Sequence, residues 1–113
     1  MPQLSISLEL SACIADCTRC HRVCLNMATN HCLEQGGRHA APEHLRTMLV
    51  CAAVCHTAAD VMMTGSPLYH RICGACAEIC DACLASCRGL DDMDDCLVAC
   101  QRCKDSCEVM ASE

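Results

Sequence analysis

The residues from Cys73 to Cys87 read CGACAEICDACLASC, and their cysteines follow one another at alternating steps of three and four. This spacing averages about 3.5 residues and places every thiol on one stripe of an α-helix. Zinc sites commonly carry their cysteine pairs on turns, but no turn separates the pairs here. The stretch therefore predicts a helix whose buried line consists of thiols.

The same spacing recurs in three other segments, so four buried lines of six positions are expected. Fifteen of these 24 positions are Cys, five are Met and two are His, and none is Leu, Ile, Val or Phe. A helical bundle normally fills such positions with branched aliphatic residues, which soft metal ligands replace here. The four lines are Cys13, Cys17, Cys20, Cys24, Met27 and His31; His44, Met48, Cys51, Cys55, Ala58 and Met62; Tyr69, Cys73, Cys76, Cys80, Cys83 and Cys87; and Met93, Cys96, Cys100, Cys103, Cys107 and Met110.

Capping residues and glycines divide the chain into four predicted helices within one domain, 1–113. The helices are expected at about 8–35, 42–64, 67–88 and 92–111. Their starts are marked by Ser7 or Ser11, by Pro42, by Ser66 with Pro67, and by Asp91 or Asp92. Because the connections are short, consecutive helices must pack antiparallel. The predicted fold is all-α, an up-down-up-down four-helix bundle with a Cys-lined core.

Residues 1–10 fit less readily, because Leu4, Ile6, Leu8 and Leu10 alternate with polar residues in a strand-like way. They form either a short packing arm or a ragged first turn.

Aliphatic residues flank the buried lines and are expected to close the contacts between helices, while the thiols face the axis. They are Ile14, Val54, Val61, Ile72, Ile79, Leu84 and Leu97. Leu25 and Val98 lie farther round and should be exposed in a monomer, which hints at self-association.

Composition and charge limit the classes of molecule that the protein can bind. The net charge of −6 argues against nucleic acid and against an anionic membrane, and a single aromatic residue offers no base-stacking platform. The first ten residues carry no Lys or Arg, and no stretch approaches 18 consecutive apolar residues, so neither a signal peptide nor a membrane span is expected. We therefore expect a cytoplasmic protein, in whose reducing environment cysteine arrays more often bind metals than form disulfides.

Several explanations compete for the thiols. Plain packing does not account for fifteen cysteines in 24 core positions. Disulfides would have to cross between helices, because thiols four apart on one helix lie too far apart for a relaxed bridge. A metallothionein-like zinc or cadmium protein, an iron–sulfur protein and a redox scaffold remain alternatives. No nucleophile–base pair or oxyanion hole is evident, so we do not expect an enzyme.

Cu(I) suits the pattern best, because it is soft and prefers thiolate and thioether ligands. It needs only two or three sulfurs, and one thiolate can bridge two ions, so a continuous column serves it better than separate quartets do. Capacity then approaches the number of thiols, roughly 16 ions per chain.

The repeated CxxCxxxC spacing, in CTRCHRVC, CGACAEICDACLASC and CLVACQRCKDSC, resembles the bacterial four-helix-bundle copper storage proteins over about residues 11–110. The resemblance, with no export signal evident, points to the cytosolic branch of that family. It implies a preformed bundle that stores many Cu(I) ions, a tetrameric assembly and no catalysis. Its ligand role carries over to the cysteines of the four lines. Cys32, one position off its line, is a less certain ligand, and the side chains of His31, His44, Met48, Met62, Met93 and Met110 are further candidates.

The two ends of the predicted bundle differ. Cys13, Met62, Tyr69 and Met110 share one end, and Cys32, Cys87, Met93, His31 and His44 share the other. The second end also carries His39 and six carboxylates, which act either as helix caps and solvated loop residues or as an acidic mouth that admits ions. We favour a ligand role for His31 and His44, and we place His21, His56 and His70 on the surface. The sequence names no donor or acceptor of copper.

Overall fold

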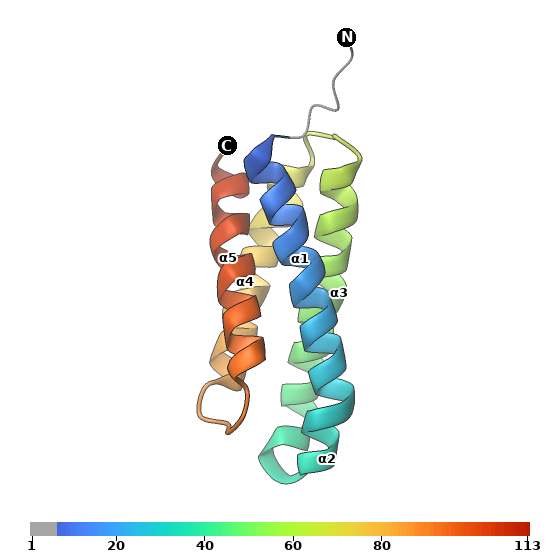
Figure 1. The fold of residues 1–113 in the computed structure, drawn as a ribbon, viewed down its shortest axis with the longest axis vertical. Helices are drawn as coiled ribbons and strands as arrows, with labels where there is room; N and C mark the ends of the chain where they lie inside the picture. Colours follow the sequence, from blue (N-terminus) through green and yellow to red (C-terminus); the bar gives the residue numbers. More distant parts are fainter. Residues whose placement is uncertain (1–6) are drawn as a thin grey trace.

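Four long antiparallel helices surround a common axis in the computed structural model, which describes residues 7–113 (Figure 1). They are α1 (Leu8–Met27), α3 (Pro42–Met63), α4 (Tyr69–Cys87) and α5 (Asp94–Ser112). Helices α1 and α4 each pack against both α3 and α5, so α1 lies diagonally across from α4. The predicted fold class is confirmed. Leu4 and Ile6 lie outside the described residues, whereas Leu8 and Leu10 belong to α1.

The connection after α1 is itself helical. A π-helical turn, η1 (Ala28–Cys32), leads into the short α2 (Leu33–Gln35) and the 3-10 helix η2 (Gly37–Ala40). This connection and the α4–α5 loop lie together at the lower end of the bundle in Figure 1, opposite the C-terminus.

Helix starts agree with the capping expectations in two places and differ in two. The Ser7 hydroxyl accepts a 3.0 Å hydrogen bond from the Leu10 N–H, and Pro42 occupies the first turn of α3. Helix α4 begins at Tyr69 rather than Pro67, because residues 67–68 form a turn.

The last helix begins at Asp94 rather than at Asp92. The reason is the positive φ of 59° at Asp92, which a right-handed helix does not allow. The carboxylates of Asp94 and Asp95 lie in the first turn of α5 instead, where they suit the helix dipole.

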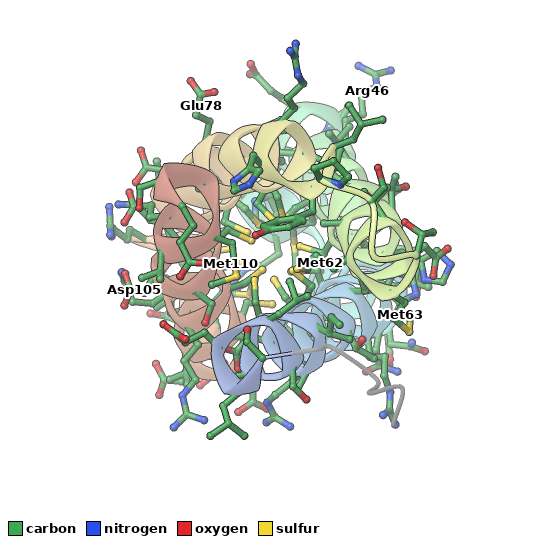
Figure 2. All side chains as sticks on the ribbon, turned by 90° about the horizontal axis from the view of Figure 1, so that it is seen from above. Arg46, Met62, Met63, Glu78, Asp105 and Met110 are labelled. Atoms are coloured by element: carbon green, nitrogen blue, oxygen red, sulfur yellow. The ribbon has the colours of Figure 1, made fainter. Side chains whose placement is uncertain are left out.

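The core consists of sulfur and small side chains. All sixteen cysteines are fully buried, and their sulfur atoms gather along the bundle axis in the view from above (Figure 2). Of the flanking aliphatic residues, Leu84 is buried and the others, including Val61, are half-buried. The half-buried ones that pack against the core are Ile14, Val54, Ile72, Ile79 and Leu97. Leu25 and Val98 are exposed, as expected. Hydrocarbon at the helix contacts therefore encloses a sulfur-lined axis.

The buried line of the first helix departs from prediction at its end. Met27 and His31 are only half-buried, and Ala28 and Cys32 occupy the core instead. Cys32 follows Cys24 by eight positions. In a regular α-helix this step would rotate the Cys32 side chain about the helix axis by roughly 80° more than two full turns. The wider π-helical turn removes this excess rotation and brings Cys32 onto the axis.

Side chains within the π-helical turn satisfy nearby backbone carbonyls. The Thr29 hydroxyl donates to the Leu25 carbonyl at 2.7 Å, and the Asn30 amide donates to the Asn26 carbonyl at 3.0 Å.

By length and composition alone, α3 is apolar enough to pass as a membrane-spanning segment, although the sequence contains no run of 18 consecutive apolar residues. Core helices of soluble proteins pass the same test, and the buried side chains of α3, including Cys51 and Cys55, face the other helices of the bundle.

Candidate metal centre

The Sγ atoms of neighbouring cysteines form a nearly continuous column, which we call the thiol column. Between helices, Cys17 and Cys107 lie 3.5 Å apart and Cys55 and Cys76 lie 3.6 Å apart. Within one helix, the Cys51–Cys55 pair is 4.0 Å apart. These thiols therefore lie within contact distance of one another along the bundle axis.

These separations can be compared with the spacing that a metal ion requires. A metal–sulfur bond of ~2.3 Å places the sulfurs of a trigonal site ~4.0 Å apart, those of a tetrahedral site ~3.8 Å apart and those of a linear site ~4.6 Å apart. The column therefore fits three or four sulfurs per ion as it stands, and two-coordinate sites require the paired sulfurs to move apart by roughly 0.6–1.1 Å.

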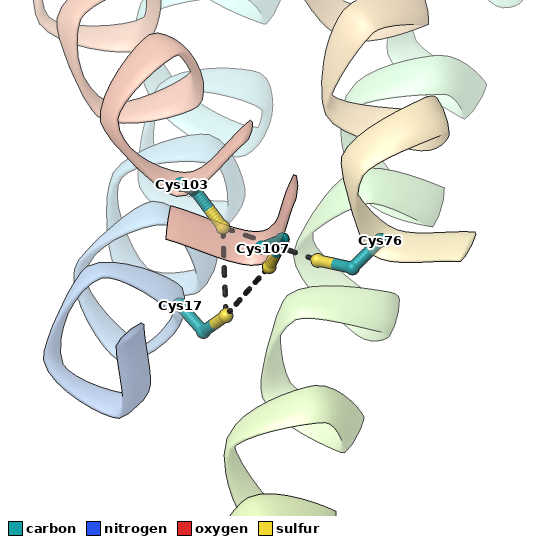
Figure 3. A group of neighbouring side chains, drawn as sticks. All are labelled: Cys17, Cys76, Cys103 and Cys107. Atoms are coloured by element: carbon teal, nitrogen blue, oxygen red, sulfur yellow. Dashed lines mark hydrogen bonds between the residues drawn. The ribbon is translucent and has the colours of Figure 1, made fainter. Parts of the chain in front are cut away.

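Within residues 7–113, four groups of thiols have all their Sγ atoms within 4.8 Å of one another. Cys20, Cys103 and Cys107 each belong to two groups, so an ion in one group shares a ligand with an ion in the next. The groups are Cys17, Cys76, Cys103 and Cys107 (Figure 3); Cys20, Cys24, Cys51 and Cys100; Cys20, Cys55, Cys80 and Cys103; and Cys13, Cys73 and Cys107. Overlap of this kind favours bridged ions over isolated sites.

The pKa values of the thiols differ along the column. Hydrogen bonds from Cys100 and Cys24 to the thiolate lower the pKa of Cys83 to about 6. The pKa of the adjacent Cys87 rises to about 12, because it shares a hydrogen bond with Cys83 and because it is buried. For Cys96 the bond with Cys24 lowers the pKa, but Cys87 and burial outweigh it and raise the pKa to about 12. Metal ions must therefore displace protons from thiols such as Cys87 and Cys96.

A mixed group of ligands occupies the lower end of the bundle. The Cys32 Sγ lies 3.6 Å from the His44 Nε2, 3.8 Å from the Met48 Sδ and 3.9 Å from the Met93 Sδ. All four side chains are buried, and the His44 Nδ1 is 2.6 Å from the Ser86 hydroxyl, which fixes the ring. Burial, followed by the neighbouring His39, lowers the pKa of His44, which favours the neutral form of the ring that binds metal.

His31 lies beside this group rather than on the column. Its Nε2 is buried and has no hydrogen-bond partner within the described chain, and its ring packs edge-on against His39 with centroids 5.4 Å apart. His39 in turn donates from its Nε2 to the Asp91 carbonyl at 2.8 Å. The carboxylates of this end are exposed. The structure thus brings imidazoles together at this end of the bundle, as predicted. Cys32 rather than His31 lies on the axis.

Met62 and Met110 are buried at the opposite end (Figure 2). His70 is half-buried there, and its Nδ1 donates to the Met110 carbonyl at 3.0 Å, so it is less exposed than a surface position predicts. His21 is also half-buried, and only His56 is exposed.

A regular α-helical spacing continued past Met27 predicts His31 on the axis and Cys32 one position off it. A signal was available in the two steps of four residues through Cys24, Ala28 and Cys32, in which a small residue sits between two thiols.

Comparison with known proteins agrees with this geometry. The model of the copper storage protein family matches residues 6–112. The uncharacterized cysteine-rich protein YhjQ of Bacillus subtilis is 38% identical over 105 residues, which cover 89% of this chain and 94% of YhjQ.

Two solved structures share the fold. Nmul_A1745 from Nitrosospira multiformis superposes with a TM-score of 0.90 at 49% identity, covering 92% of this chain and 95% of that one. The Cu(I)-bound copper storage protein BsCsp3 superposes with a TM-score of 0.81 at 35% identity, covering 91% and 98%. This chain is a member of the copper storage protein family.

Proposed function

We propose that this protein stores Cu(I) as a chain of bridged ions held by the thiolates of the column. The observation that carries the proposal is the overlap of the four thiol groups at Cys20, Cys103 and Cys107. Cu(I) accepts two or three soft sulfur ligands and tolerates sharing them. The Cu(I)-bound relative has the same fold, and the metal here is cargo rather than a catalytic cofactor.

The number of sulfurs used per ion separates Cu(I) from zinc and cadmium. Zinc takes four ligands in a tetrahedron, whereas Cu(I) takes two or three sulfurs, so the same column holds more Cu(I) ions than zinc ions. Cys103 contacts Cys17 at 3.5 Å, Cys55 at 3.7 Å and Cys76 at 3.9 Å, so it joins neighbouring groups. A ligand so placed suits a bridge between two ions.

We assign the admission of ions to the lower end of the bundle. Met48, Met93 and neutral His44 bind Cu(I) without losing a proton, and Cys32 touches all three. From Cys32 an ion passes to the thiols farther up the axis. His31, with its unpartnered Nε2, is the neighbouring imidazole that would take part.

We further propose that the protein is cytoplasmic, forms a homotetramer and catalyses no reaction. All sixteen cysteines are free thiols, and a thiolate store needs a reducing compartment to remain so. Exposed apolar side chains on several helices, among them Leu25, Leu49 and Val98, supply surface for self-association.

X-ray absorption of the copper-loaded protein tests the proposal. Bridged storage predicts a first shell dominated by sulfur together with clear copper–copper scattering. A spectrum without copper–copper scattering at high loading would show isolated sites and would reject the shared column.

A further inference from the structure

The metal ligands at the lower end of the bundle are shut off from solvent. Cys32 and Met48 are fully buried, Met93 is 1% exposed and His44 is 6% exposed. The Nε2 atom of the neighbouring His31 is also buried. An ion can therefore reach these side chains only after part of the lower end has moved.

The 3-10 helix η2 (Gly37–Ala40) is the segment placed to cover this group. It packs against η1, which carries Cys32, and against α3, which carries His44. Its own His39 is half-buried and meets the His31 ring edge-on, with centroids 5.4 Å apart. At this end of the bundle (Figure 1), η2 therefore lies across the two elements that carry these ligands.

A side-chain hydrogen bond joins η2 to the α4–α5 loop. The His39 Nε2 donates to the carbonyl of Asp91 at 2.8 Å, two positions before the buried Met93. A carbonyl oxygen can only accept a hydrogen bond, so Nε2 carries a proton and has no lone pair for an ion while this bond exists. The bond therefore ties the two connections together instead of leaving this nitrogen free to bind metal.

Two glycines at the start of η2 supply a place for the segment to turn. Gly36 has φ 69° and ψ −163°, and Gly37 has φ 54°. Positive φ values strain other residues, whereas glycine moves among them readily. Within the described chain, no atom beyond the adjacent residues lies within 4 Å of a Cβ built at either glycine, so packing does not hold this backbone in place.

We propose that η2 is a movable strap over the copper entrance, that His39 holds it closed, and that ions pass when it turns about Gly36 and Gly37. Because ions are assigned to enter at this end, the inference rests on the proposed function. Closing the strap buries the His31 Nε2 with no hydrogen-bond partner in the described chain, which raises the free energy of the closed state. Since a hydrogen bond contributes only a modest net free energy, loss of the His39 bond should raise the open fraction roughly two- to tenfold.

Rates of copper transfer in both directions test the strap. Uptake of Cu(I) from its complex with a weak chelator is followed by stopped flow, and release is followed with an excess of a tight chromophoric chelator. His39→Ala removes the bond, whereas His39→Gln keeps an amide that can donate to the Asp91 carbonyl. His56→Ala is the matched control, because it removes an exposed histidine about three helical turns beyond His44 on α3.

A strap held by His39 predicts that His39→Ala speeds uptake and release by the same factor, roughly two- to tenfold, with an unchanged Cu(I) endpoint. His39→Gln and His56→Ala should keep the wild-type rates. Slower uptake in His39→Ala would make His39 a ligand on the route and would overturn the proposal. Unchanged rates in His39→Ala, faster uptake without faster release, or equal acceleration in His39→Gln would overturn it as well.

Alkylation of the reduced, metal-free protein separates the strap from storage. Iodoacetamide should modify Cys32 faster in His39→Ala than in the wild type, by the same factor as the copper rates. Cys13, buried at the opposite end, should react at an unchanged rate, which distinguishes local opening from a general loss of stability. Equal Cys32 rates in the two proteins, or equal acceleration at Cys13, would overturn the strap even where the copper titration shows storage.

Discussion

Cys87 and Cys96 make the stability of the metal-free bundle depend on alkaline pH. Both thiols are fully buried, and their pKa values rise from 9.0 to about 12 on folding. Above pH 9 the unfolded chain loses these protons, while the folded chain keeps them up to pH 12. Their contribution is therefore fully present below pH 9 and is lost progressively as the pH rises from 9 to 12.

The size of the effect follows from linkage. When the pH rises from 8 to 10, each thiol with these pKa values lowers the free energy of unfolding by about 1.4 kcal/mol, and the pair lowers it by about 2.7 kcal/mol. The double variant Cys87→Ala/Cys96→Ala lacks this contribution. Between pH 8 and pH 10, the fall in its free energy of unfolding should therefore be about 2.7 kcal/mol smaller than the fall in the wild type.

Denaturant unfolding of the fully reduced, metal-free protein, followed by far-ultraviolet circular dichroism at pH 8 and pH 10, measures both quantities. The variant loses core atoms and will be less stable at either pH, but only the difference between the two pH values enters the comparison. Equal losses of stability in wild type and variant would refute the assignment of raised pKa values to these thiols.

Three further outcomes are expected. Cys103→Ala should lower the Cu(I) endpoint by more ions than Cys32→Ala does, because Cys103 belongs to two thiol groups; equal endpoints in the two variants would argue against bridging. Apparent Cu(I) affinity should fall by about tenfold per pH unit for each thiol proton displaced as the solution is acidified, and a competition titration at pH 7.5 and 6.5 that shows no change would contradict this. His31→Ala combined with His44→Ala should slow loading in stopped-flow uptake more than it lowers capacity, and unchanged rates would remove these imidazoles from the path.

The periodicity of the sequence was sufficient to predict the four-helix bundle, because the alternating steps of three and four place the thiols of each segment on one face of a helix. The contacts among Cys20, Cys55 and Cys103 depend on the rotation and spacing of three helices, which periodicity along one helix does not specify. Which thiols bridge two groups could therefore be learned only from the structure.

Local backbone geometry accounts for the errors. A uniform step of 3.5 residues placed His31 on the axis, whereas the π-helical turn placed Cys32 there. Asp92 has the residue type of a helix cap but adopts a positive φ in the preceding turn. The π-helical turn changes which residues face the axis, whereas the positive φ at Asp92 only moves the start of α5.

An anaerobic titration of the fully reduced protein with Cu(I), against a competing chromophoric chelator, tests the central claim most directly. Storage by bridged thiolates predicts a sharp endpoint near the number of thiols, roughly 16 ions per chain. An endpoint of one to four ions, or tighter binding of zinc at four thiols per ion, would contradict it.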